Sequence, residues 1–162
     1  MTSERLTFGW GWHQARLRAA KSYWIVTTGP DGAPHAAPVW GVWSEGGLWF
    51  STSGTSRKAR NLQRDPRVVV HLDSSDDVVM IEGTAEVVTG GEALGRARHE
   101  YATKYALTDG DAADLTGVPA APVFRVRPRL AHTWLEPAFP QTMARWRFED
   151  GGDPVFEPNS YG

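Results

Sequence analysis

The chain has 162 residues, a formal net charge of −2 and 41% hydrophobic residues, a balance typical of one soluble domain with a single core. It contains no cysteine, which excludes disulfides, thiolate nucleophiles and cysteine-based zinc or iron–sulfur sites. The N-terminus lacks an apolar stretch of signal-peptide length and no segment approaches the roughly 20 residues that span a bilayer, so we expect a cytoplasmic protein without membrane contact.

The first third of the chain predicts a helix followed by three strands. Residues 12–20 favour a helix, and residues 23–28 form a strand that ends at the turn Gly29-Pro30-Asp31-Gly32. Residues 36–43 are the next strand, which a glycine-rich turn joins to the strand at residues 48–51. We therefore expect a three-stranded meander with tight connections.

The remaining elements are strands with one longer helix. The strands are expected at residues 67–72, 78–88, 123–127, 129–135 and 144–148, the helix at residues 92–105, and a loop rich in Gly, Pro and Asp at residues 108–122. Six or more strands with few helices predict a mainly β fold, a closed antiparallel barrel. We expect one barrel domain over residues 1–148 and an extended or mobile tail over residues 149–162, whose Phe156 and Tyr161 could lie along a neighbouring surface.

The most informative segment is residues 48–70, which combines a strand, a hydroxyl-rich loop, a basic helix and a second strand. The loop consists of Thr52-Ser53-Gly54-Thr55-Ser56, and Thr55 or Ser56 is expected to cap the helix. Arg57 and Lys58 fall in the first helical turn, where the positive end of the helix dipole destabilises cations. A phosphate bound there would remove this unfavourable interaction. The alternative is a capped surface helix with a solvated basic face.

No side chain stands out as a nucleophile or general base. No nucleophile-elbow motif occurs, and the five histidines do not fall at metal-ligand spacings. An enzyme of this composition would rely on a bound cofactor, with the protein supplying orientation and electrostatics. Nucleic-acid binding is disfavoured, because the net charge of the chain is negative and its basic cluster covers only a short segment. This cluster consists of Arg57, Lys58, Arg60, Arg64 and Arg67.

The eight tryptophans are unusually many for this length. Those in strand-like segments are expected in the core or on a sheet face, namely Trp24, Trp40, Trp43 and Trp49. Those near element ends are expected to cover a groove or a partner subunit, namely Trp10, Trp12, Trp134 and Trp146.

The run from Phe50 through Ser56-Arg57-Lys58-Ala59-Arg60 to Pro66-Arg67-Val68 resembles the flavin-phosphate segment of the pyridoxamine 5′-phosphate oxidase-like split-barrel family. The resemblance extends over residues 21–148. It implies an FMN-binding split β-barrel, and the short length and the ending from Trp134 to Phe148 resemble the branch that uses the deazaflavin F420. The C-terminal tail does not resemble the substrate-binding segment of true pyridoxamine phosphate oxidases, so oxidation of that vitamin is not implied.

The resemblance implies an oxidoreductase that uses F420 or FMN to transfer hydride to or from a flat, conjugated small molecule. The alternatives are an FMN-dependent flavoprotein of the pyridoxamine 5′-phosphate oxidase type and a split barrel that binds a cofactor or tetrapyrrole without turnover. It also implies a homodimer with cofactor sites at the interface. No catalytic side chain and no metal is implied.

The resemblance assigns cofactor contacts to three groups of residues. The isoalloxazine or deazaflavin ring would lie along Pro38, Val39 and Trp40, and the ribityl chain and phosphate would meet Ser51, Thr52, Ser53, Ser56, Arg57 and Lys58. Trp134 and Arg145 would reach the cofactor of the other subunit, although Arg145 and Arg147 are equally typical of a solvated edge strand. Arg60, Arg64 and Lys104 are candidates for the acidic tail of F420. The substrate pocket would be walled by Trp40, Trp134 and Trp146.

Overall fold

The computed structural model describes residues 8–108, 115, 120–150 and 152–157. Its helices are α1 (Trp10–Ala19), α2 (Arg57–Arg64) and α3 (Glu92–Tyr105), with one 3-10 turn, η1 (Glu136–Ala138). Its strands are β1 (Tyr23–Thr28), β2 (Pro34–Val39), β3 (Val42–Ser44), β4 (Gly47–Ser51), β5 (Arg67–His71), β6 (Asp77–Val88), β7 (Val123–Leu135), β8 (Ala144–Arg147) and β9 (Val155–Glu157). The mainly β prediction is confirmed.

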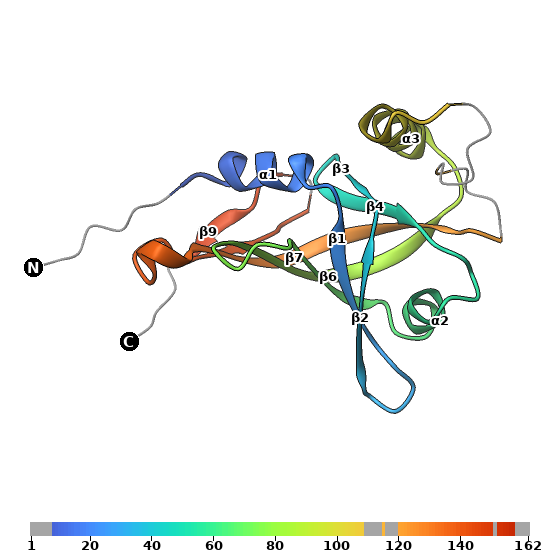
Figure 1. Cartoon of the computed structure of the whole chain (residues 1–162), viewed down its shortest axis with the longest axis horizontal. Coiled ribbons are helices and arrows are strands. Elements are labelled where there is room, and N and C mark those ends of the chain that lie inside the picture. Colours follow the sequence, from blue (N-terminus) through green and yellow to red (C-terminus); the bar gives the residue numbers. More distant parts are fainter. Residues whose placement is uncertain (1–7, 109–114, 116–119, 151, 158–162) are drawn as a thin grey trace, which may run out of the picture.

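The strands form one antiparallel sheet in the order β2-β1-β5-β6-β7-β4-β3, and β8 and β9 continue from β7 as a side branch (Figure 1). The two end strands, β2 and β3, follow each other in the chain but do not pair in the described structure. The split barrel implied by the resemblance is confirmed, whereas the expected hydrogen-bonded closure is wrong, because the sheet stays open between β2 and β3.

The predicted strand at residues 36–43 is in fact two strands at opposite ends of the sheet. The chain leaves β2 at Val39, crosses over through Trp40 and Gly41, and enters β3 at Val42. A Cβ atom at Gly41 would lie 2.8 Å from Leu48 Cδ1 and 3.0 Å from the Trp49 carbonyl oxygen, so the crossover passes too close to β4 for a side chain. The expected three-stranded meander is therefore wrong.

The predicted strands at residues 123–127 and 129–135 are one continuous strand, β7. The pairing of β6 with β7 shifts register between Glu82 and Gly83, so that Gly83 lies opposite Pro128 and Glu82 opposite Leu130. Arg129 is left as the extra residue of a β-bulge, which lets the sheet accept a proline that cannot donate to the ladder. The separation expected from Pro128 is wrong for this reason.

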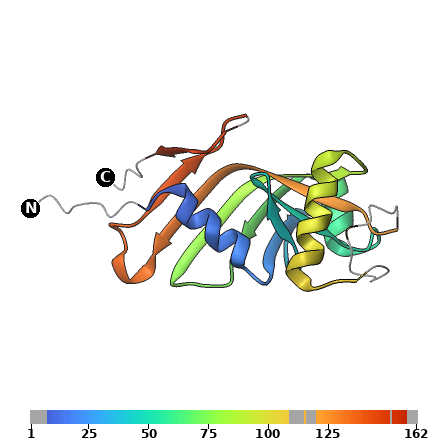
Figure 2. The same ribbon diagram turned by 90° about the horizontal axis from the view of Figure 1, so that it is seen from above.

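Two hydrophobic clusters fill the fold. The larger one lies inside the barrel and is covered by α1, while the smaller one lies between α3 and the β3–β4 hairpin (Figure 2). Trp43 and Trp49 are each 1% exposed, as expected for core positions, but Trp10 and Trp146 are also buried. None of the helices in the described ranges is long and apolar enough to cross a bilayer.

The C-terminal segment adds a strand to the sheet. β9 pairs with β8, so the alternative of a solvated edge strand at Arg145 and Arg147 is wrong. Glu157 forms ion pairs with both arginines on the neighbouring strand. Phe156 packs edge-on against Trp146 of the same chain, with ring centroids 5.4 Å apart. Tyr161 lies outside the described residues.

Candidate functional site

Helix α2 is capped as its sequence predicts, and it is anchored to β1. Ser56 is the N-cap, and its Oγ accepts a hydrogen bond from the Ala59 backbone N–H at 3.2 Å. Asn61 is 2% exposed and donates from Nδ2 to Thr27 Oγ1 on β1 at 3.0 Å. The helix ends before Pro66, which cannot continue it. These bonds fix the direction in which the basic face of α2 points.

The cations of α2 fall into two groups. Arg64 donates to the carbonyl oxygen of Thr28, and just beyond the helix Arg67 pairs with Asp65. Arg57, Lys58 and Arg60 make no side-chain hydrogen bond or ion pair within the described part of the chain. Uncompensated cations at a helix N-terminus repel the dipole, and an anion placed there relieves both the repulsion and the free N–H groups of the first turn.

The loop before α2 holds its hydroxyl groups in an ordered arrangement. Thr52 Oγ1 donates to Ser56 Oγ at 3.1 Å, and the hydroxyls of Ser53 and Thr55 share a hydrogen bond of 3.0 Å. Ser51 Oγ lies 3.1 Å from two carbonyl oxygens, those of Ala121 and Pro122, so its hydrogen is taken and it can only accept from a ligand. Ser56 accepts two bonds and keeps its own hydrogen for an anion.

Strand β2 presents a free edge, since it pairs only with β1. Pro34 and Pro38 have no N–H and face Thr28 and Trp24 in the register, so by the alternation of antiparallel pairs the backbone groups of Pro34, Ala36 and Pro38 point away from β1. The edge therefore offers one donor, the Ala36 N–H, and three carbonyl acceptors. Val39 is 8% exposed and lies in the core, and by the same alternation its backbone groups face Tyr23 on β1, so Val39 offers no backbone group to a ligand at this edge.

Trp40 stands at the end of this edge and is 45% exposed. Its ring stacks on Tyr105, the last residue of α3, with centroids 4.4 Å apart and planes 4° apart. The neighbouring Lys104 donates from Nζ to the Gly41 carbonyl oxygen at 2.8 Å and to the Tyr23 hydroxyl at 2.9 Å. Burial lowers the pKa of Lys104 to about 8. The contacts of Tyr105 and Lys104 with Trp40 and Gly41 have no local sequence signal, because they join distant segments of the chain.

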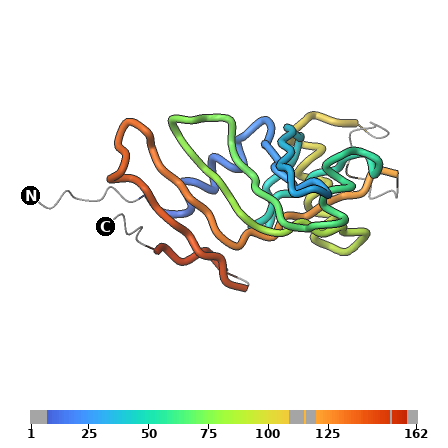
Figure 3. The backbone as a smooth tube through the Cα atoms, turned by 90° about the horizontal axis from the view of Figure 1, so that it is seen from below, coloured from blue at the N-terminus to red at the C-terminus, as the bar shows by residue number. Residues whose placement is uncertain are grey.

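Trp134 and Arg145 lie far from α2 within one chain. Figures 2 and 3 show β8 and the end of β7 at one end of the molecule and α2 with α3 at the other. Trp134 donates from Nε1 to Glu136 at 2.8 Å, and Arg145 pairs with Glu157 at 3.4 Å. Trp146 is 4% exposed and donates to Thr133 Oγ1, so its expected place in a pocket wall is wrong and it is a core residue.

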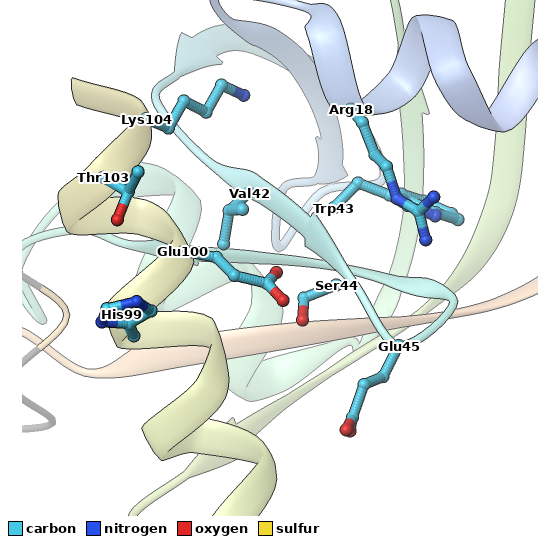
Figure 4. A pocket seen from close by; sticks show the side chains of 9 residues that line it. All are labelled: Arg18, Val42, Trp43, Ser44, Glu45, His99, Glu100, Thr103 and Lys104. Atoms are coloured by element: carbon cyan, nitrogen blue, oxygen red, sulfur yellow. The ribbon is translucent and has the colours of Figure 1, made fainter.

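A cavity of about 660 Å³ lies in the described chain beside α1, the β3–β4 turn and β7. Two smaller ones lie elsewhere. One of about 510 Å³ opens between α1, β3 and α3, where Arg18, Glu100 and Lys104 surround the Val42–Ser44 strand (Figure 4). Another of about 280 Å³ lies beside the β1–β2 hairpin and includes Arg67 and Glu82. None of these cavities is lined by Arg57, Lys58 or Trp40, so in a single chain the candidate site is an open surface along α2 and β2.

Comparison with known proteins agrees with this architecture. A conserved hypothetical protein from Mycobacterium tuberculosis is 29% identical, with a TM-score of 0.66 over 83% of this chain and 91% of its own. An FMN-binding, pyridoxamine 5′-phosphate oxidase-related protein from Nostoc punctiforme is 15% identical, with a TM-score of 0.63 over 93% of this chain and 96% of its own. A structure named F420 reductase is 22% identical, with a TM-score of 0.56 over 72% of this chain and 93% of its own.

No curated protein matches the chain. The family model described as pyridoxamine 5′-phosphate oxidase matches residues 12–135, which include the helix α2 segment, the β2 edge and most of the barrel. The chain thus belongs to the pyridoxamine 5′-phosphate oxidase family.

Proposed function

We propose that this protein is an oxidoreductase that binds F420 or FMN and exchanges hydride with a flat, conjugated small molecule. The observation that carries the proposal is the set of unpaired cations at the start of α2. Arg57 and Lys58 have no protein partner in the described structure, and they adjoin a loop whose Ser56 hydroxyl hydrogen is free. Arg offers a planar fork and Lys a point charge, which together suit a phosphate.

The β2 edge supports the placement of the cofactor ring. β2 has six residues and spans about 20 Å, and its hairpin end adjoins the C-terminal half of α2, where Arg64 bonds Thr28. A molecule that runs from α2 along this edge to Trp40 must be elongated. A deazaflavin or flavin, when bound, supplies the hydride chemistry. Arg57 and Lys58 hold the phosphate. The Ala36 N–H and the Pro38 carbonyl oxygen face the polar rim of the ring, and Trp40 provides an apolar surface at the end of the β2 edge.

The cations proposed for the acidic tail of F420 differ in their availability. Arg60 has no partner in the described structure, whereas Arg64 is bonded to Thr28 and Lys104 to Gly41 and Tyr23. Only Arg60 is therefore ready to bind a polyglutamate without breaking a bond. The preference for F420 over FMN rests on the resemblance of the chain's ending to the deazaflavin branch.

We further propose a homodimer in which Trp134 and Arg145 of one subunit complete the site of the other. The support is that these residues lie remote from α2 in one chain and that the α2–β2 surface is open. A row of half-buried side chains also crosses the outer sheet face in register, namely Trp24, His71, Met80 and His132. Such a row suits contact with a second sheet.

The test is a titration of cofactor-free protein with F420 and with FMN, followed by quenching of tryptophan fluorescence. We expect the Arg57→Ala/Lys58→Ala double variant to bind the preferred cofactor more than tenfold more weakly while keeping its fold. The matched control is Arg18→Ala/Lys21→Ala, which removes the same charge from another surface. Equal affinity of the first pair and wild type would remove the phosphate assignment, and binding of neither cofactor by wild type would remove the proposed function.

A further inference from the structure

Trp40 has one covered face and one free face. Tyr105 lies parallel to the indole at 4.4 Å, so a flat molecule cannot approach from that side. No second ring of the described chain stacks on Trp40, and the residue remains 45% exposed. A large aromatic side chain that shows one bare face to solvent is suited to receive another planar ring.

The ring that supports Trp40 is itself held firmly. The Tyr105 hydroxyl lies 2.7 Å from the Lys21 carbonyl oxygen and 3.0 Å from both the N–H and the carbonyl oxygen of Gly41. Its ring also packs against Tyr101 on the preceding turn of α3, with centroids 4.8 Å apart. Tyr105 is thus fixed at both its ring and its hydroxyl.

The backbone next to Trp40 is fixed by the same turn of α3. Lys104 Nζ binds the Gly41 carbonyl oxygen and the Tyr23 hydroxyl, and the Gly41 N–H donates to Tyr105. Gly41 also has no room for a side chain between Leu48 and Tyr23. The peptide groups that follow Trp40 therefore have little freedom, and the indole cannot swing away from Tyr105 at low cost.

We propose that Tyr105 and Lys104 are positioning residues that hold Trp40 as a rigid stacking platform, and that its free face takes the planar conjugated reactant of the proposed hydride transfer. This inference rests on the proposed function. It assigns the choice of substrate shape to the last turn of α3, an element outside the phosphate and β2 surfaces. A rigid platform selects flat rings, because a puckered ring of similar size cannot make the same face-to-face contact.

The test uses the full chain labelled with 5-fluorotryptophan, in which Trp40→Phe identifies the Trp40 signal in the ¹⁹F spectrum. Menadione is the planar probe and 1-decalone, a saturated bicyclic ketone, is the shape control, both added to the cofactor-loaded protein. We expect menadione, but not decalone, to move the Trp40 signal. Tyr105→Leu should broaden that signal even without cofactor and weaken menadione binding about fivefold, while Tyr105→Phe, which keeps the ring, should restore most of the affinity.

Lys104→Met should alter the Trp40 signal more than the other tryptophan signals. An unchanged Trp40 signal in Tyr105→Leu would overturn the positioning role. Equal menadione affinity in Trp40→Leu, which removes the aromatic face, and wild type, or no binding at all, would overturn the platform. Failure of the proposed function is distinguished by the titration, in which neither F420 nor FMN would bind. The effect of Tyr105 on the Trp40 signal is read without cofactor and does not depend on that result.

Discussion

Lys104 donates from Nζ to the carbonyl oxygen of Gly41 at 2.8 Å, which joins the last turn of α3 to the crossover between β2 and β3. The same ammonium group bonds the Tyr23 hydroxyl and lies 4.7 Å from the centre of the Tyr23 ring. No carboxylate pairs with it in the described contacts. The charge is thus stabilised only by neutral oxygens and aromatic faces, and its burial lowers the pKa of Lys104 to about 8.

The pKa of Lys104 predicts that stability rises with pH in the mildly basic range. Since the folded state favours the neutral amine, the stabilising contribution is fully present above the unfolded pKa of 10.5 and is lost as pH falls through about 8. Urea unfolding between pH 7 and pH 10 should show wild type gaining stability relative to Lys104→Met. Burial raises the pKa of Tyr23 and of Tyr105. Both proteins carry these tyrosines, so the free energy of unfolding of each should fall above pH 10. Parallel curves for the two proteins up to pH 10 would contradict this account.

A side chain at Gly83 should be poorly tolerated. A Cβ there would lie 2.2 Å from the Arg127 carbonyl oxygen and 3.1 Å from Pro128 Cα, both backbone atoms of the bulged strand. Because neither can move without breaking the β6–β7 pairing, we expect Gly83→Ala to lower the free energy of unfolding by about 3 kcal/mol.

Gly95 provides the matched control for that substitution. It lies within α3, where an added Cβ meets nothing within 4 Å, and alanine is the better helix former by about 1 kcal/mol. Chemical denaturation should therefore show Gly95→Ala more stable than wild type and Gly83→Ala less stable. Similar effects at both positions would mean that the close contact at Gly83 is relieved by small shifts.

The local elements could be predicted where sequence alone determines them. The bounds of β1 and α3 match those expected, and α2 begins after the Ser56 cap and ends before Pro66, as the sequence predicts. The errors occur where distant strands decide the outcome. The sequence around Trp40 and Gly41 contains no signal that the chain crosses from one end of the sheet to the other. The close contact that requires glycine at position 41 is made by Leu48 and Trp49 on β4. From the sequence alone, Pro128 predicts the end of a strand. The strand continues through it because Pro128 lies opposite Gly83, which is remote in sequence.

The candidate site was predictable only in part. The residues of α2 form a local motif, and Arg57 and Lys58 have no partner among the residues that the structure describes. Trp146 is buried and does not line a pocket as expected. The alternation of Arg145, Trp146 and Arg147 is a signal for this, because in a strand the tryptophan points inward when the two arginines point outward. The support of Trp40 by Tyr105 had no sequence signal, because it depends on how α3 packs against the crossover.

The anchor of α2 predicts a stability effect with a bearing on the site. Asn61 and Thr27 are each 2% exposed and share a hydrogen bond of 3.0 Å. Asn61→Ala removes the bond and leaves the Thr27 hydroxyl buried without its donor, at a cost of about 2 kcal/mol. Gln63→Ala, at an exposed position of the same helix, should change stability by less than about 0.5 kcal/mol. Thermal unfolding of the two variants gives the comparison, and a mild effect at Asn61 would contradict the anchor.

His13 predicts a loss of stability in mild acid. It is 3% exposed on α1, with Nε2 3.3 Å from Thr133 Oγ1, and its Nδ1 has no hydrogen-bond partner among the described residues. Burial lowers its pKa to about 4, although nearby Asp77 acts in the opposite direction. The folded state therefore favours the neutral ring, so its contribution is complete above the unfolded pKa of 6.5 and is lost as pH falls toward 4.

The comparison protein for this prediction is His13→Phe, which keeps an aromatic ring among Trp10 and Trp146 but cannot titrate. Any fixed cost of the substitution displaces its whole stability curve, whereas the proton linked to His13 changes the slope by at most about 1.4 kcal/mol per pH unit. Unfolding measured from pH 7 to pH 4 should show the two curves converging as wild type loses stability faster. Carboxylates that protonate in this pH range do so in both proteins and therefore cancel in the comparison. A difference in unfolding free energy that stays constant with pH would mean that His13 is charged in the folded state or gains no stability from staying neutral.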